Sequence, residues 1–185
     1  MPNIEVYKII NIMKALFLSI LITISFLAIG QKIETSSSKI TFEISNFGIN
    51  TVEGEITGMT GTVDLKKGEI DVCVKPATVS TGIEKRDDHL KTADFFNADK
   101  YPEICFVSSK LENTDKGYLA TGRLTLHGQT KTVKIPLAVS ASGSQTILKG
   151  EFDVNRFDYG LGAEAYDGTF QVGKIAKVKI TCVVK

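Results

Sequence analysis

Alternation of apolar and polar residues is the feature that most constrains how this chain can fold. From Lys32 to the C-terminus, apolar side chains recur at every second position in one segment after another. Because successive side chains of a strand point to opposite faces, such a pattern places one apolar set on one face. The pattern predicts an antiparallel β-protein with one buried sheet face. It is clearest in the segments 40–44, 70–74, 118–126, 133–139, 148–154 and 176–184.

Short glycine-containing turns separate these segments. Turns of this length join neighbouring antiparallel strands. About eight strands connected mainly by hairpins predict an up-and-down β-barrel, with a sandwich as the alternative. Pro136 lies inside one apolar segment, and because proline has no backbone N–H we expect it at a strand edge or a bulge. The turns are Lys66-Lys67-Gly68, Asp115-Lys116-Gly117, His127-Gly128 and Ser142-Gly143-Ser144.

The segment from residue 81 to 101 interrupts the alternation. Thr81 and Glu84 have the spacing of a capping box, which predicts the start of a short helix. The helix carries a dense run of charged residues from Glu84 to His89, and Phe95 and Phe96 follow within a few residues. Charges on one side and two large aromatic rings on the other indicate a helical plug at the mouth of a barrel.

The N-terminus has the organisation of a secretory signal peptide. Lys14 precedes an apolar run from residue 15 to 29, and Ala28-Ile29-Gly30 places small residues at a cleavage position. The run is short for a membrane span, and a retained N-terminal anchor is the alternative. We therefore expect residues 1–30 to be removed, translation to start as late as Met13, and residues 31–185 to form one exported, periplasmic domain without stable membrane insertion.

The charge of this domain excludes two classes of partner. Without residues 1–30 the chain has 20 basic and 20 acidic side chains, so its net charge is near zero. Such a balance does not recruit nucleic acid or an anionic membrane surface. The sequence has no glycine-rich phosphate-binding loop either. We expect a neutral or apolar ligand.

The three cysteines allow at most one intramolecular disulfide. Cys182 shares a strand face with aliphatic residues and is predicted to be a buried free thiol. Cys73 and Cys105 each lie opposite the aliphatic face of their strand. A bridge between them is one option, which the spacing does not decide.

Catalytic and metal-binding patterns are weak. The only histidines are His89, in the charged helix, and His127, which we expect to be an exposed turn residue. Nothing in the spacing favours a dyad of Cys105 and His89. No CxxC, HxH or HxxxH pattern occurs. We expect no enzyme activity, no cofactor and no metal.

Small residues at inward positions bear on whether the barrel is hollow. An eight-stranded barrel either fills with its own side chains or holds one small ligand. Ala120, Gly122 and Gly150 fall at positions where a filled interior would have bulky residues. They predict either a cavity or the close approach of a neighbouring element.

Together, these residues resemble the YceI-like family of secreted, lipocalin-like proteins that bind polyisoprenoid or other long-chain lipids. The similarity extends along nearly all of the chain after residue 30. One departure occurs at Ser45-Asn46-Phe47-Gly48, where the family often has a histidine, and it indicates a different head group on the ligand. The matching elements, in chain order, are Ser38–Phe42, Val52-Glu53-Gly54, Ser80-Thr81-Gly82, Arg86–Leu90, Asp94-Phe95-Phe96, Tyr101–Phe106, Gly122–Gly128 and Asn155–Gly160.

The resemblance implies a lipocalin-like barrel around an apolar tunnel, closed by the 81–101 helix and without chemistry of its own. The ligand would be a long-chain isoprenoid or fatty-acyl lipid, and a homodimer is compatible with the sequence. The polar mouth residues that would meet a head group are Arg86, His89 and Arg156. The expected apolar wall is formed by Phe42, Phe106, Leu124, Leu137, Phe152 and Phe157, with Phe95 and Phe96 at the cap.

Two other functions fit the sequence. The first is a non-enzymatic module with a filled barrel core that contacts another envelope protein through an exposed apolar patch. The second is an enzyme acting on a lipid, in which case replacement of His89 or Cys105 would abolish turnover.

Overall fold

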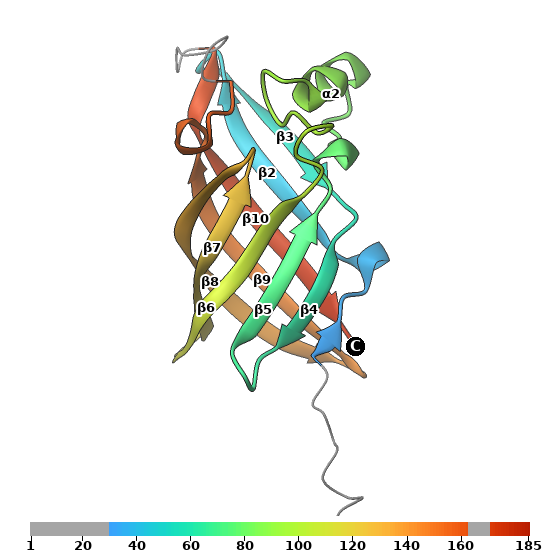
Figure 1. The fold of residues 1–185 in the computed structure, drawn as a ribbon, viewed down its shortest axis with the longest axis vertical. Helices are drawn as coiled ribbons and strands as arrows, with labels where there is room; N and C mark the ends of the chain where they lie inside the picture. The colour runs from blue at the N-terminus through green and yellow to red at the C-terminus, as the bar shows by residue number, and fades with distance from the viewer. Residues whose placement is uncertain (1–29, 163–170) are drawn as a thin grey trace, which may run out of the picture.

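The protein forms one curled antiparallel sheet with a short helix at one end (Figure 1). The computed structural model describes residues 30–162 and 171–185. Over this part of the chain the helices are α2 (Glu84–Lys91) and the 3-10 helices η2 (Thr35–Ser37), η3 (Pro76–Thr78) and η4 (Arg156–Tyr159). The strands are β1 (Gln31–Lys32), β2 (Lys39–Asn46), β3 (Asn50–Ile56), β4 (Thr60–Asp64), β5 (Glu69–Val74), β6 (Ile104–Thr114), β7 (Gly117–Leu126), β8 (Gln129–Ser142), β9 (Gln145–Asn155) and β10 (Val172–Val184).

The prediction of an N-terminal signal peptide is not tested by the structure. The predicted signal peptide lies outside the described residues except for Gly30, and so does the alternative start at Met13. Within the described ranges, no helix combines the length and the apolar character that a bilayer crossing requires.

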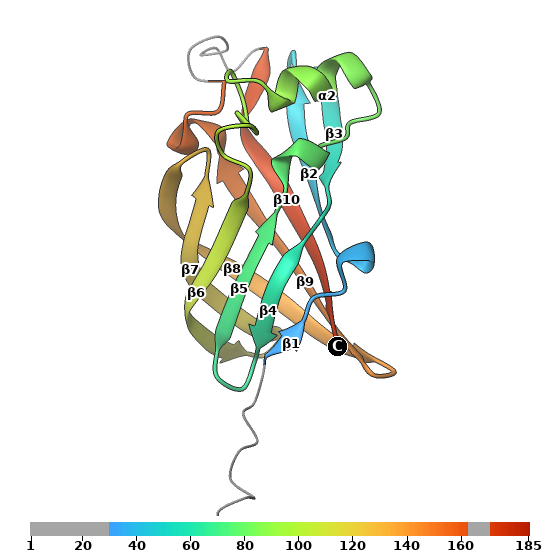
Figure 2. The same cartoon turned by 45° about the vertical axis from the view of Figure 1, so that its right-hand side comes forward.

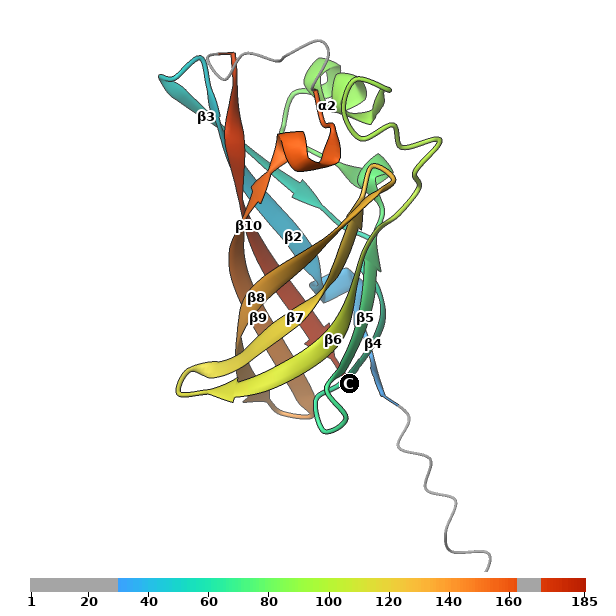
Figure 3. The same ribbon diagram turned by 60° about the vertical axis from the view of Figure 1, so that its left-hand side comes forward.

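The strands follow one another around the barrel in the order β1-β4-β5-β6-β7-β8-β9-β10-β2-β3. Two isolated bridges lie near the edges of this sheet: Ile33, next to β1, pairs with Val184 of β10, and Glu55 of β3 pairs with Ser80. The prediction of an antiparallel barrel is confirmed, and Figures 2 and 3 show its curvature from two sides. The predicted number of about eight strands is wrong: the described residues contain ten. The two-residue β1 escapes a periodicity test, and a left-handed glycine, Gly58, separates β3 from β4.

The predicted alternation produces the core. Inward side chains of every long strand meet in one apolar cluster that includes Ala120, Leu124 and Leu126 of β7 and Ile135 and Leu137 of β8. The turn residues His127 and Gly128 both have positive φ, which is the geometry of the tight turns that join antiparallel strands. His127 is half-buried, and its Nδ1 lies 3.0 Å from the carbonyl oxygen of Tyr159. The expectation of an exposed turn histidine is therefore wrong.

Pro136 lies where β8 changes neighbours. The pairing of β8 with β7 reaches Leu137, and its pairing with β9 begins at the same residue. Pro136 pairs with Leu119 and precedes the first residue paired with β9. On its β9 side the proline thus lies at the end of the ladder, as its missing N–H predicts.

The helical insertion is present, but its start differs from the prediction. The N-cap of α2 is Ile83, whose side chain makes no capping hydrogen bond. Thr81 instead pairs through its backbone N–H and its hydroxyl with the Oδ1 atom of Asp87. The predicted capping box of Thr81 and Glu84 is wrong, because the segment before the helix folds back onto its first turn.

The cysteines occupy two kinds of position. Cys73 and Cys105 are directly opposite each other on β5 and β6 and form a disulfide. Cys182 is a buried free thiol, as predicted. Its burial raises the pKa of the thiol to about 11, so it remains a neutral part of the core.

Candidate ligand cavity

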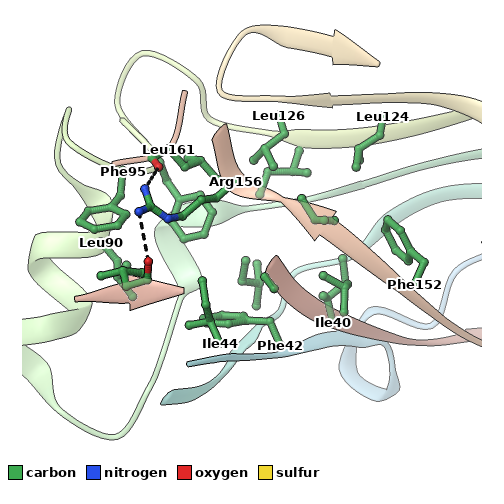
Figure 4. Close-up of a pocket in the computed structure, with 17 residues that line it drawn as sticks. Ile40, Phe42, Ile44, Leu90, Phe95, Leu124, Leu126, Phe152, Arg156 and Leu161 are labelled. Atoms are coloured by element: carbon green, nitrogen blue, oxygen red, sulfur yellow. Dashed lines mark hydrogen bonds between the residues drawn. The ribbon is translucent and has the colours of Figure 1, made fainter. Parts of the chain in front are cut away.

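The barrel interior contains an apolar hollow beneath α2, called here the upper hollow. Its volume is about 140 Å³. Figure 4 shows Leu90 and Phe95 from the helical segment at one end, with Leu124 and Leu126 facing Ile40, Phe42 and Ile44 across the space. The remaining lining residues are Ile56, Phe96, Ile104, Phe152, Val154, Arg156, Leu161, Val172, Ala176 and Val178.

A second apolar hollow lies deeper in the barrel. This lower hollow has a volume of about 70 Å³ and is lined by Phe106, Ala120 and Leu137, among others. The two hollows share four wall residues, which form the constriction between them. The constriction consists of Ile40, Ile104, Leu124 and Phe152.

A third hollow, the mouth, joins the upper hollow to the end of the barrel. Its volume is about 170 Å³, and it lies between the end of β2 and the helix α2. Phe42, Leu90 and Phe95 line both the mouth and the upper hollow. The mouth adds the polar residues Ser45, Asn46, Arg86 and His89. The three hollows therefore form one series of mainly apolar spaces, and polar side chains gather in the lining only at its outer end.

Arg156 lies within this series but is committed to the protein backbone. Its side chain is only 3% exposed and lines the upper hollow. The guanidinium donates to the carbonyl oxygens of Gly173 (3.0 Å), Leu161 (2.8 Å), Gly162 (3.0 Å) and Val172 (3.2 Å), partly visible as dashed lines in Figure 4. It thereby joins η4 to the start of β10. This arrangement assigns Arg156 a structural role and argues against the predicted contact with a polar head group.

Arg86 and His89 also make contacts within the 81–101 segment. Arg86 donates through Nε to the hydroxyl of Thr81 (2.7 Å) and through Nη2 to its carbonyl oxygen (2.9 Å). His89 Nε2 lies 3.7 Å from the Oδ2 atom of Asp94, and its ring meets the ring of Phe95 edge-on at 5.3 Å. Both residues line the mouth, as predicted, and both also fasten the 81–101 segment.

Most of the predicted wall residues meet in the cavity. Phe42, Phe95 and Phe96 line the upper hollow, and Leu124 and Phe152 line both apolar hollows. Phe106 and Leu137 line the lower one. Phe157 lines none of the three hollows; its ring lies 4.0 Å from the guanidinium of Arg156. The prediction of Phe157 as a wall residue is thus not supported by its position.

Several wall residues were missed, although the sequence carried a signal for some of them. Ile40 and Ile44 share the inward face of β2 with Phe42, and Val178 and Ala176 share that of β10. Period-two counting would have included all four. Leu90 belongs to α2, a helix without buried residues, so no pattern indicated its place in the wall.

Of the small inward residues, Ala120 lines the lower hollow, whereas the two glycines do not enlarge the cavity. A Cβ atom on Gly122 would lie 2.6 Å from the ring of Phe106 and 2.4 Å from the carbonyl oxygen of Val107. A Cβ on Gly150 would lie 3.0 Å from Leu137 and 3.0 Å from Ile135. Both glycines therefore permit close packing, which was the alternative interpretation.

Gly54 makes room for a cavity wall. A Cβ atom at this position would lie 2.4 Å from Cζ of Phe42, so the ring of Phe42 covers the backbone of β3. The requirement for glycine here explains why the Val52-Glu53-Gly54 element matters to the interior. This is a packing requirement and involves no ligand chemistry.

Groups that could bind a metal are scarce in the described ranges. Cys73, Glu103 and Cys105 bring three ligand atoms within 4.8 Å of one another. The disulfide between the two cysteines engages both sulfur atoms, which leaves Glu103 as the single carboxylate.

Comparisons with known proteins agree with the fold and the motifs. Residues 31–184 match the YceI-like domain. A UPF0312 protein from Photorhabdus laumondii is 31% identical over 126 residues, which cover 64% of this chain and 66% of the relative. The matched segment thus spans slightly less than two thirds of that relative's length.

Two solved structures have the same fold. BcnA of Burkholderia cenocepacia superposes with a TM-score of 0.75 at 23% identity, covering 83% of this chain and 99% of that protein. A polyisoprenoid binding domain from Saccharophagus degradans, implicated in plant cell wall breakdown, gives a TM-score of 0.70 at 15% identity and covers 84% and 98%. At these identities the likeness is one of fold.

Proposed function

This chain belongs to the YceI-like family, and on that premise we propose that its barrel holds the apolar chain of one polyisoprenoid or other long-chain lipid for transport, storage or scavenging. The observation that carries the proposal is the series of mainly apolar hollows, with several polar side chains in the lining of the mouth. The structural relative from Saccharophagus degradans is described as a polyisoprenoid binding domain, which supports the same ligand class.

The size of the hollows limits how much of a long chain each one can hold. A dry apolar cavity of about 150 Å³ accommodates a molecule such as benzene. The upper hollow, at about 140 Å³, is of that size. A long chain therefore has to pass the constriction of Ile40, Ile104, Leu124 and Phe152 or continue through the mouth. Each buried methylene contributes about 0.8 kcal/mol, so ten methylenes are enough for binding without strong polar contacts.

We further propose that the protein acts by binding alone and outside the cytoplasm. The candidate residues for chemistry are all engaged structurally: Cys105 in a disulfide, and His89 against Asp94 and Phe95. The apolar run after Lys14 supports export to the periplasm. Cell fractionation and mass determination of the mature N-terminus test the location, and a mature chain that retains residues 1–30 would contradict it.

A cavity-filling variant tests the proposed ligand site. Ala176 lines the upper hollow, and Ala138 lies exposed on the outer face of β8. Native mass spectrometry and organic extraction of the purified protein should detect a bound lipid in the wild type and in the matched control Ala138→Phe. The variant Ala176→Phe should be folded and lack it.

The proposal fails if the wild type carries no extractable lipid and binds no isoprenoid or fatty-acyl probe. Equal lipid content in Ala176→Phe and Ala138→Phe would place the lipid elsewhere than in the upper hollow. A lipid-free protein with a stable partner on its outer surface would instead favour the filled-core interaction module.

A further inference from the structure

The turn between β2 and β3 exposes apolar side chains at the tip of a hairpin. Ile49 is 84% exposed and Phe47 is 47% exposed. Ile49 N donates to the carbonyl oxygen of Asn46 (3.4 Å), and Phe47 and Gly48 both have positive φ, at 52° and 67°. The backbone N–H of Phe47 donates to the carbonyl oxygen of Gln171 (3.1 Å), the residue just before β10. These two hydrogen bonds restrain the backbone of the tip.

Local folding preferences do not account for this choice of residues. A β-turn whose two central residues both have positive φ favours asparagine, aspartate or glycine, and an aromatic residue there is unfavourable. The segment from Ser45 to Val52 contains no charged residue at all. Protruding apolar residues in an uncharged setting commonly mark an interaction surface.

A third exposed apolar residue lies at the start of α2. Ile83 is 54% exposed and occupies the N-cap, a position where serine, threonine, aspartate or asparagine is preferred. The β2–β3 hairpin and α2 lie at the same end of the barrel (Figure 3). Both elements line the mouth, through Asn46 of the hairpin and Arg86 of the helix. Phe47, Ile49 and Ile83, called here the apolar rim, are therefore exposed next to the two elements that line the mouth.

We propose that the apolar rim inserts into the interfacial region of a phospholipid bilayer and brings the mouth against the membrane surface. The inference rests on the proposed function, in which the cavity holds a lipid. A lipid that lies in a bilayer could then enter the cavity without crossing water. A narrow, protruding tip fits a deformable surface, and its asparagine, serine and threonine side chains suit hydrogen bonding with lipid head groups. The near-zero net charge of residues 31–185 predicts that this binding depends only weakly on salt.

A single tryptophan reports insertion directly, because the chain contains none. Ile49→Trp places it on the rim. The matched control, Ser144→Trp, places it at an exposed position in the β8–β9 hairpin, at the opposite end of the barrel (Figure 2). With vesicles of the zwitterionic lipids phosphatidylethanolamine and phosphatidylcholine, Ile49→Trp emission should shift to the blue and be quenched by brominated acyl chains. Ser144→Trp should do neither. Quenching of both variants or of neither would overturn the proposal.

Removal of the apolar side chain separates membrane docking from ligand binding. Ile49→Ser should weaken vesicle binding about tenfold. The exposed isoleucine side chain would bury most of its apolar area in the membrane, and serine has almost no apolar area to bury. The variant should slow the uptake of a fluorescent prenyl probe from vesicles to a similar degree, and leave the affinity for the same probe delivered in detergent unchanged.

The other outcomes separate the two proposals. Equal uptake from vesicles by Ile49→Ser and wild type would refute membrane insertion of the apolar rim and leave the proposed function intact. If Ile49→Ser also loses probe binding in detergent, the hairpin tip belongs to the ligand site, and membrane insertion of the apolar rim is refuted as well. A wild-type dimer that Ile49→Ser converts to a monomer would assign the tip to self-association. A wild type that binds the probe from neither source would refute the proposed function itself.

Discussion

Replacing Arg156 tests whether this residue stabilises the fold or binds the head group of a ligand. The perturbation is Arg156→Lys, which keeps the charge and most of the length. The guanidinium donates to four backbone carbonyls spread over Leu161, Gly162, Val172 and Gly173. A planar fork with five N–H groups can reach acceptors on both sides, whereas an ammonium is a single donor atom with three protons.

The expected loss follows from the hydrogen bonds that lysine cannot make. At least two of the four carbonyls would lose their donor in a site where the side chain is 3% exposed. Hydrogen bonds to a charged group contribute roughly 1.5–3 kcal/mol each, so the free energy of unfolding should fall by about 4 kcal/mol. With a urea m-value of about 2 kcal/mol/M, the midpoint of unfolding should move down by about 2 M.

The assay is urea unfolding followed by circular dichroism, with lipid content measured in parallel. Arg123→Lys is the matched control, because Arg123 is exposed on β7 and its replacement should leave the midpoint unchanged. Arg156→Lys should unfold earlier yet still carry lipid while folded. Wild-type stability together with loss of bound lipid would refute the reasoning and return Arg156 to the role of a head-group ligand.

Three further predictions concern stability and thiol chemistry. Replacing Cys73 and Cys105 by alanine opens a crosslink of sequence separation 32 and should lower the free energy of unfolding by about 3–4 kcal/mol; an unchanged urea midpoint would contradict this. Gly122→Ala should cost about 3 kcal/mol, because its methyl group would meet a backbone oxygen at 2.4 Å; a thermal midpoint equal to that of the wild type would show that the strand can shift. Burial raises the pKa of the Cys182 thiol to about 11 from 9.0, so this thiol contributes stability below pH 9 that is lost as the pH rises toward 11. Iodoacetamide should therefore label Cys182 only after denaturant is added, and rapid labelling of the native protein at pH 8.5, with Cys182→Ala as the blank, would contradict its burial.

The residues that the sequence placed correctly in the cavity share one property. Phe42, Leu124, Leu137 and Phe152 stand at inward positions of strands, where the side-chain direction follows from counting by two. Once the sheet closes, their convergence is unavoidable. Phe157 was misplaced because it belongs to η4, where period-two counting no longer applies.

The small and polar residues were harder to interpret. Gly122 and Gly150 could leave space or permit contact, and only the positions of Phe106 and Leu137 show that contact occurs. The disulfide between Cys73 and Cys105 depends on the register between β5 and β6, which places the two residues directly opposite each other. Register is a property of two segments at once and is not contained in either pattern alone.

Local sequence was sufficient to determine the secondary structure class, the positions of the main hairpins and the inward face of the long strands, because side-chain alternation and turn geometry are properties of neighbouring residues. Tertiary structure decided which end of the barrel is open, how the hollows connect and what the buried guanidinium of Arg156 does. The fate of Arg156 illustrates the difference: its four acceptors come from two segments that only the closed barrel brings together. A polar residue near a cavity can bind a ligand or satisfy the backbone, and the distances to its neighbours decide between the two.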